Sequence, residues 1–143
     1  MNPKARRFAR QYAVQAIYQW QLAGTNPRDI EAQFVAQHEM SKKTDHEYFK
    51  ELIHTVPSMV NELDQHMEPF SDIPINELDP IELAILRLSI FELAKRPDIP
   101  YKVVINEALE LTKKFGSDEG HKFVNGILDN VAKKLREIEI SNK

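Results

Sequence analysis

The first helical stretch of the sequence, residues 5–22, carries side chains suited to binding nucleic acid. At about 100° per residue, Arg7, Gln11 and Tyr18 fall within an arc of about 40° on one side of the helix. Arginine forks bind phosphate oxygens, glutamine can read base edges, and a tyrosine ring can stack on a base. This face indicates a nucleic-acid site, with an ordinary solvated helix surface as the alternative. The other side is an apolar stripe of Ala5, Ala9, Ala13, Ala16 and Trp20.

Basic side chains are concentrated at the start of the chain. Arg6 and Arg10 flank the face that carries Arg7, and no acidic residue occurs before Asp29. Five of the 19 basic side chains lie in the first 28 residues, which leaves 14 against all 22 acidic ones in the remainder. This asymmetry favours a polyanion site at one end and a different kind of partner surface elsewhere.

A second candidate site for phosphate lies at the start of the last predicted helix, about residues 120–138. His121, Lys122 and Phe123 occupy its first turn, where free backbone N–H groups and the helix dipole favour anions. The inward-facing stripe begins at Val124, which leaves Phe123 at its margin. We therefore expect Phe123 to stack on a base, with burial in the core as the alternative.

The strongest helix start in the chain is Asp79–Pro80, an N-cap followed by a proline in the first helical position. The helix that follows is apolar on most sides, so we expect it at the centre of the second half. Its polar residues Glu82, Ser89 and Glu92 gather on one side, with Ile85 among them. This edge suits a protein contact, and a solvated edge is the alternative.

Helical spacing of apolar residues continues through the rest of the chain, and only four glycines occur. Asn26 and Pro27 predict a helix start after a stop at Gly24. Pro57 should kink or split the helix predicted from Asp45 to about Met67. We predict an all-α fold of about six or seven helices in a single domain. Its two small helical-bundle halves are expected at about residues 1–70 and 78–143, joined by a proline-rich connection.

The residues that several kinds of catalysis and metal binding require are missing from the sequence. The chain has no cysteine, and its five histidines show no metal-ligand spacing. Phosphate-binding loops and nucleophile motifs are also missing, so we expect no enzyme activity, metal or cofactor. The aliphatic runs are too short to cross a bilayer, and glutamines interrupt any signal-type apolar region near the N-terminus. We therefore expect a cytoplasmic protein.

Three segments resemble a known family. They are ARRFARQYAVQAIYQWQL (residues 5–22), ILRLSIFEL (85–93) and PYKVVINEALELTKKFGSDEGHKFVNGILDNVAKKL (100–135). Together they closely resemble the NusB family of bacterial transcription antitermination factors, over essentially the whole chain, and INEA and KFVNGILD are specific to it. The resemblance implies the NusB-like fold, which is all-helical with two bundle-like halves.

The resemblance also implies a function. NusB-like proteins pair with the ribosomal protein NusE, and the heterodimer binds the single-stranded boxA element of nascent RNA. With other Nus factors and RNA polymerase, it helps assemble a complex that elongates through terminators, notably in ribosomal RNA operons. No chemical step is catalysed.

The family pattern assigns roles to individual residues. Its RNA-contacting positions match Arg6, Arg7, Arg10, Tyr18, Lys122 and Phe123, to which the helix geometry adds Gln11. The predicted NusE-binding side comprises Glu82, Ile85, Ser89 and Glu119. Two departures occur. Phe8 stands where some relatives have a third consecutive arginine, and Glu119 replaces an aspartate, which leaves open whether this carboxylate reaches the same partner atom.

Other functions remain open from the sequence. A helical protein-interaction module without direct RNA binding would also explain the grooves, with the arginines serving solubility. NusB-like domains also precede RNA methyltransferases, but the chain ends after its last predicted helix, so we expect no such enzyme here. Some NusB-like proteins form homodimers that could cover the arginine face, and the sequence does not decide this.

Overall fold

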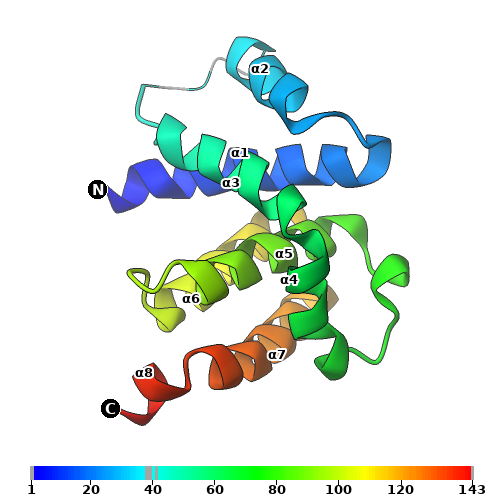
Figure 1. The fold of residues 1–143 in the computed structure, drawn as a ribbon, viewed down its shortest axis with the longest axis vertical. Coiled ribbons are helices and arrows are strands. Elements are labelled where there is room, and N and C mark those ends of the chain that lie inside the picture. Colours follow the sequence, from blue (N-terminus) through cyan, green and yellow to red (C-terminus); the bar gives the residue numbers. More distant parts are fainter. Residues whose placement is uncertain (1, 38–39, 41, 143) are drawn as a thin grey trace. The chain divides into compact units, whose positions relative to one another are not determined.

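A computed structural model describes residues 2–37, 40 and 42–142 of the chain. These residues form eight α-helices and two single-turn 3-10 helices, with no strand among them (Figure 1). The all-α prediction is confirmed, with slightly more helices than the six or seven expected. The α-helices are α1 (Pro3–Ala23), α2 (Pro27–Gln37), α3 (His46–Ser58), α4 (Val60–Met67), α5 (Pro80–Lys95), α6 (Tyr101–Phe115), α7 (Asp118–Leu135) and α8 (Glu137–Ser141); the 3-10 helices are η1 (Glu68–Phe70) and η2 (Ile75–Glu77).

The chain divides into two compact units, Met1–Met59 and Val60–Lys143. The division lies where α3 ends, just after Pro57, and not in the proline-rich stretch near residues 68–80. As Pro57 predicted, the long helix of the sequence is split in two.

Helix α4 belongs to the second unit because it packs on α5. Its apolar side chains Leu63 and Met67 are fully buried. Beside them, the guanidinium of Arg87 on α5 binds the Asp64 carboxylate of α4 through two hydrogen bonds of 2.9 and 2.8 Å. A bidentate pair of this kind fixes the angle between the two helices as well as their separation.

The first unit is built by α1, α2 and α3. Its helix boundaries follow the local signals in the sequence. Gly24 ends α1 in the left-handed conformation, at a φ of 67°, and its N–H donates to the Trp20 carbonyl. The Asn26 side chain then accepts from the Arg28 N–H at 2.9 Å and caps α2, with Pro27 in the first position.

The buried side of α1 is wider than the alanine stripe predicted. Ala9, Ala13 and Ala16 are fully buried, as expected, but Val14 and Ile17 are buried as well. Small side chains on the stripe let helices approach closely, and α1 contacts both α2 and α3. The polar face of α1 is correspondingly narrow.

The second unit surrounds α5 with α4, α6 and α7. Asp79 caps α5 by accepting from the Glu82 N–H at 3.1 Å, as the sequence predicts. Most of the α5 side chains from Leu83 to Leu93 are buried, which confirms its central place. No helix in the described part of the chain combines the length and apolarity needed to cross a membrane.

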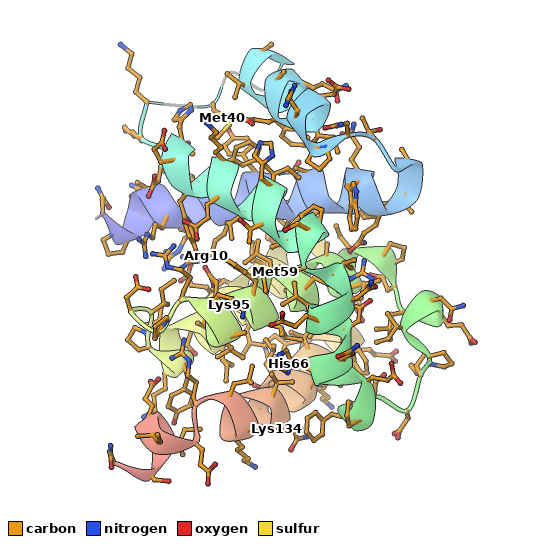
Figure 2. The ribbon with its side chains drawn as sticks, in the orientation of Figure 1. Arg10, Met40, Met59, His66, Lys95 and Lys134 are labelled. Carbon is orange, nitrogen blue, oxygen red and sulfur yellow. The ribbon has the colours of Figure 1, made fainter. Side chains whose placement is uncertain are left out.

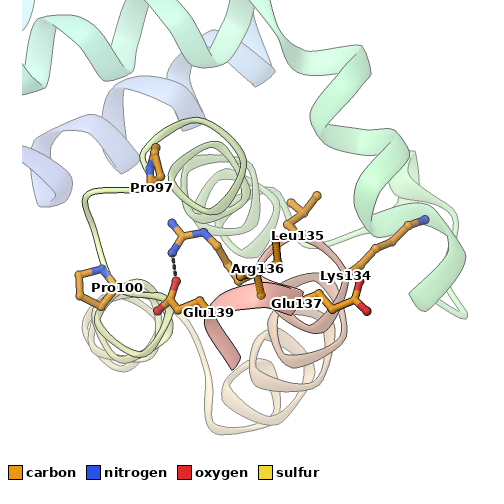
Figure 3. Close-up of a pocket in the computed structure, with 8 residues that line it drawn as sticks. Pro97, Pro100, Lys134, Leu135, Arg136, Glu137 and Glu139 are labelled. Carbon is orange, nitrogen blue, oxygen red and sulfur yellow. Dashed lines mark hydrogen bonds and ion pairs between the residues drawn. The ribbon is translucent and has the colours of Figure 1, made fainter. Parts of the chain in front are cut away.

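The last predicted helix is interrupted at Arg136, which adds α8 to the count. The buried Arg136 guanidinium donates to the backbone carbonyls of Leu93, Glu92 and Arg96 at 2.8–3.1 Å, and so satisfies the end of α5. It also pairs with Glu139 (Figure 3). The other Glu139 oxygen accepts from the first N–H of α6, that of Tyr101. Arg136 and Glu139, just before and within α8, thus stabilise the connection between α5 and α6.

Candidate nucleic-acid interface

Helix α1 presents part of the predicted RNA-binding face to solvent. The Arg7 side chain is exposed, and Gln11 and Tyr18 are half-buried. All three lie on the same regular helix, so the shared face predicted from their spacing is present in the first unit. The Arg7 guanidinium, the Gln11 amide and part of the Tyr18 ring are therefore accessible along one side of α1.

The other two predicted arginines lie against α3. The Arg6 guanidinium lies over the Tyr48 ring, 4.7 Å from its centroid, and its Nε is 3.9 Å from Asp45 Oδ2. Arg10 (Figure 2) is only 4% exposed, and its guanidinium is 5.6 Å from the centre of the same ring. The cation–π contacts hold both side chains against Tyr48.

Asp45 joins the starts of α1 and α3. Its carboxylate caps α3 by accepting from the Tyr48 N–H at 3.0 Å, and its own N–H donates to the Ala5 carbonyl at 3.0 Å. Asp45 and Tyr48 are not among the site residues predicted from the sequence. Nothing in the local pattern around these two residues indicates a contact with α1.

The second predicted phosphate site differs from the expectation, because α7 begins at Asp118 and not at about residue 120. Lys122 and Phe123 therefore lie in its second turn, and the free backbone N–H groups of the first turn lie beside the acidic residues Asp118 and Glu119. Ser117 caps this helix by accepting from the Gly120 N–H at 3.0 Å. Lys122 is exposed and Phe123 is half-buried, while Val124 is fully buried. Phe123 therefore lies at the margin of the buried stripe, and part of its ring is accessible.

The two predicted partner-binding carboxylates lie near each other in the second unit. A Cβ atom added to Gly120 would lie 2.3 Å from Glu82 Oε2, so the Glu82 side chain rests directly against the first turn of α7. Glu119 precedes Gly120 and is exposed. Burial, with a smaller effect of the Asp79 carboxylate, raises the pKa of Glu82 above its usual value.

The other two residues predicted for the partner side lie deeper. Ile85 is fully buried and Ser89 is 1% exposed, as is Glu92 on the same edge of α5. This edge is not a solvated surface in the structure. Glu82 and Glu119 are the accessible members of the four residues predicted to bind the partner.

In the described ranges, no three His, Asp or Glu side chains are grouped so that they could hold a metal ion. Helices α1 and α7 carry cations, amides, aromatic rings and carboxylates, groups that interact with phosphates, base edges and basic side chains.

Comparison with known proteins connects this arrangement to a family. The model of the NusB family matches residues 7–133. The transcription antitermination protein NusB of Idiomarina loihiensis is 56% identical over 136 residues, which cover 95% of this chain and 97% of that protein. The NusB protein of Alcanivorax borkumensis is 50% identical over 142 residues, or 99% of this chain and 94% of that one.

Solved structures give the same result. The fold is similar to that in a crystal structure of the antitermination factors NusB and NusE in complex with double-stranded RNA, with a TM-score of 0.85 and 29% identity. The match covers 93% of this chain and 99% of that one. A NusB structure from T. maritima matches with a TM-score of 0.74 and 27% identity, over 92% of each chain. The chain therefore belongs to the NusB family of transcription antitermination factors.

Proposed function

We propose that this protein binds boxA RNA in nascent transcripts, notably those of ribosomal RNA operons, as a heterodimer with the ribosomal protein NusE. The heterodimer then helps other Nus factors and RNA polymerase assemble an antitermination complex. The protein acts in the cytoplasm, where it meets the growing transcript, and it catalyses no chemical step.

The observation that carries this proposal is the similarity to the NusB chain crystallised with NusE and RNA, at a TM-score of 0.85 over 93% of this chain. That complex contains double-stranded RNA. Our preference for single-stranded boxA follows the family pattern and is supported by the accessible aromatic edges of Tyr18 and Phe123, because unstacked bases are recognised by stacking.

We assign the RNA contacts by chemistry and accessibility. Arg7 and Lys122, which are exposed, neutralise phosphates. Tyr18 and Phe123 stack on bases, and Gln11 reads a base edge. The remaining two arginines, Arg6 and Arg10, hold the start of α3 through Tyr48 and add positive potential to the surface.

The NusE contact is assigned to the beginnings of α5 and α7. Glu82 and Glu119 offer carboxylates to a basic side chain of the partner. Ile85 and Ser89 support this surface from the body of α5, where both are buried. This region carries carboxylates, whereas the start of α1 is basic, so the two proposed binding surfaces differ in charge.

The alternative is a protein-interaction module that does not touch RNA. One observation favours it: Arg6 and Arg10 contact Asp45 and Tyr48 within the first unit, so part of the basic cluster serves the fold. Under this alternative, NusE would still bind the carboxylates, but Arg7 would be ordinary surface.

Copurification separates the two functions. The protein would be purified with NusE from cells and treated with ribonuclease before and after size-exclusion chromatography. We expect co-elution of the two proteins with an absorbance at 260 nm that ribonuclease removes. Co-elution with no ribonuclease-sensitive absorbance would support the protein-only alternative, and failure to bind NusE would contradict both.

A further inference from the structure

Two adjacent lysines, Lys42 and Lys43, lie just before α3, and both side chains are exposed. The two residues that follow them are anchored: Thr44 and Asp45 are 5% and 8% exposed. The lysines therefore extend into solvent from a backbone segment that is held in place on its C-terminal side.

The anchor places this segment beside the start of α1. The Asp45 N–H donates to the Ala5 carbonyl at 3.0 Å, and α1 and α3 begin on the same side of the first unit (Figure 1). Consecutive Cα atoms are 3.8 Å apart, so the Cα atom of Lys43 lies at most about 7.6 Å from that of Asp45. Lys42 and Lys43 thus belong to the same corner as the first turns of α1.

Cations dominate the surface of this corner. Lys4 and Arg7 are exposed on α1, and Lys42 and Lys43 are exposed before α3. The nearby Asp45 carboxylate is buried, lies 3.9 Å from the Arg6 guanidinium and caps α3. An exposed carboxylate of the opposite sign, Glu47, lies in the first turn of α3. Within residues 2–7 and 42–47, these four exposed cations outnumber the one exposed carboxylate, which gives a local surface that attracts polyanions.

We propose that Lys42 and Lys43 bind RNA phosphates and extend the phosphate-binding surface of α1 across the start of α3. The inference rests on the proposed RNA-binding function and adds residues to it. A lysine ammonium on a flexible four-carbon stem suits a phosphate as a point charge, without base specificity. The two lysines supply accessible positive charge that Arg10 does not, because its guanidinium is buried against Tyr48.

Counterion release gives the expected size of the effect. For a single strand, each phosphate neutralised contributes about 0.7 to the slope of log affinity against log salt. Replacing both lysines with glutamine should make that slope shallower by up to about 1.4. At 0.1 M monovalent salt this amounts to a loss of about 5-fold in affinity for each phosphate contact removed.

The test measures the salt dependence of binding to fluorescent single-stranded boxA RNA in the presence of NusE, for wild type and for Lys42→Gln/Lys43→Gln. The matched control is Lys133→Gln/Lys134→Gln, a second adjacent exposed pair, in the last turn of α7 (Figure 2 labels Lys134). The control pair lies about 16–18 Å along the helix axis from Lys122. Circular dichroism and thermal unfolding would establish that both double variants are folded.

We expect the Lys42/Lys43 variant to bind more weakly than wild type, with a shallower salt slope, and the control variant to match wild type. Equal slopes and affinities for the two double variants would overturn the inference while leaving the proposed function intact. No binding of boxA RNA by wild type with NusE would instead overturn the proposed function, and the inference with it.

Discussion

The Glu82 carboxyl group rests against Gly120, where a Cβ atom would lie 2.3 Å from Oε2 and 2.7 Å from Cδ. Glycine at this position therefore allows a carboxylate of α5 to lie over the first turn of α7. The start of α7 carries Lys122 and Phe123, so one contact connects the proposed NusE side to the proposed RNA side of the second unit.

Gly120→Ala should displace the Glu82 carboxyl and weaken NusE binding. The fold should survive, because the displaced group is the end of a flexible side chain and alanine favours the helix. Gly126→Ala is the matched control, since a Cβ there meets nothing within 4 Å. It should raise the free energy of unfolding by about 0.5–1 kcal/mol and leave NusE binding unchanged. Isothermal titration with NusE checks both, and equal affinities of the two variants would show that Glu82 is not positioned for NusE.

Glu82→Gln should stabilise the protein at neutral pH. The pKa of Glu82 is raised by burial and by Asp79. The folded state therefore binds the proton more tightly than the unfolded state, in which the pKa of a glutamate is about 4.3. Charging Glu82 therefore opposes folding as pH rises through its folded pKa, and the opposition is absent below about pH 4.3. Urea unfolding at pH 7 and pH 4 should show the advantage of Glu82→Gln at pH 7 alone.

The control for that experiment is Glu119→Gln, which removes an exposed carboxylate from the first turn of α7. It should gain no stability at pH 7, because a surface carboxylate near a helix N-terminus is mildly stabilising. An equal gain for both variants would mean that general charge reduction, and not the burial of Glu82, sets the stability.

The boundaries of the helices could largely be predicted from sequence because the signals are local. Asp79 caps α5 and Asn26 caps α2 through their own side chains, within three residues. Arg136 shows the limit of such signals. Its place looked like one more position in a continuous helix, yet its guanidinium is buried on carbonyls 40 to 44 residues away in sequence. Only the packing of α7 against α5, which brings Arg136 to the end of α5, determines that role.

The candidate site was predictable to a similar degree. Spacing alone identified the shared face of Arg7, Gln11 and Tyr18, because a helix fixes directions locally. It could not distinguish the exposed Arg7 from the buried Arg10, since that difference depends on Tyr48, which α3 brings against α1. Periodicity likewise grouped Ile85 with Ser89 on one edge of α5 but did not predict that the edge is buried.

Arg7→Gln and Arg10→Gln should therefore have different effects. Arg7→Gln is expected to weaken RNA binding by about 5-fold at 0.1 M salt, through one lost phosphate contact, and to change stability by less than about 0.5 kcal/mol. Arg10→Gln should lower the free energy of unfolding by about 1–2 kcal/mol, because it removes a desolvated cation–π contact. Chemical unfolding and RNA titration of both variants check this, and identical behaviour would refute the distinction.

Tyr18→Ala and Phe123→Ala should each weaken boxA binding by about 5- to 150-fold, since stacking on a base contributes about 1–3 kcal/mol. Tyr18→Phe and Phe123→Tyr keep the rings and should bind nearly as wild type does. Fluorescence anisotropy with boxA RNA measures the affinities. Wild-type binding by both alanine variants would remove these aromatic rings from the RNA surface.

The most direct test of the central claim is a titration of labelled boxA RNA, against a scrambled control, at two salt concentrations, with and without NusE. We expect selective binding of boxA that NusE strengthens and that weakens with salt, with a log–log slope of about −2 to −3 for the three or four phosphates bound by Arg7, Lys122, Lys42 and Lys43. Binding of NusE with no preference for boxA under any condition would contradict RNA recognition and leave a protein-interaction module.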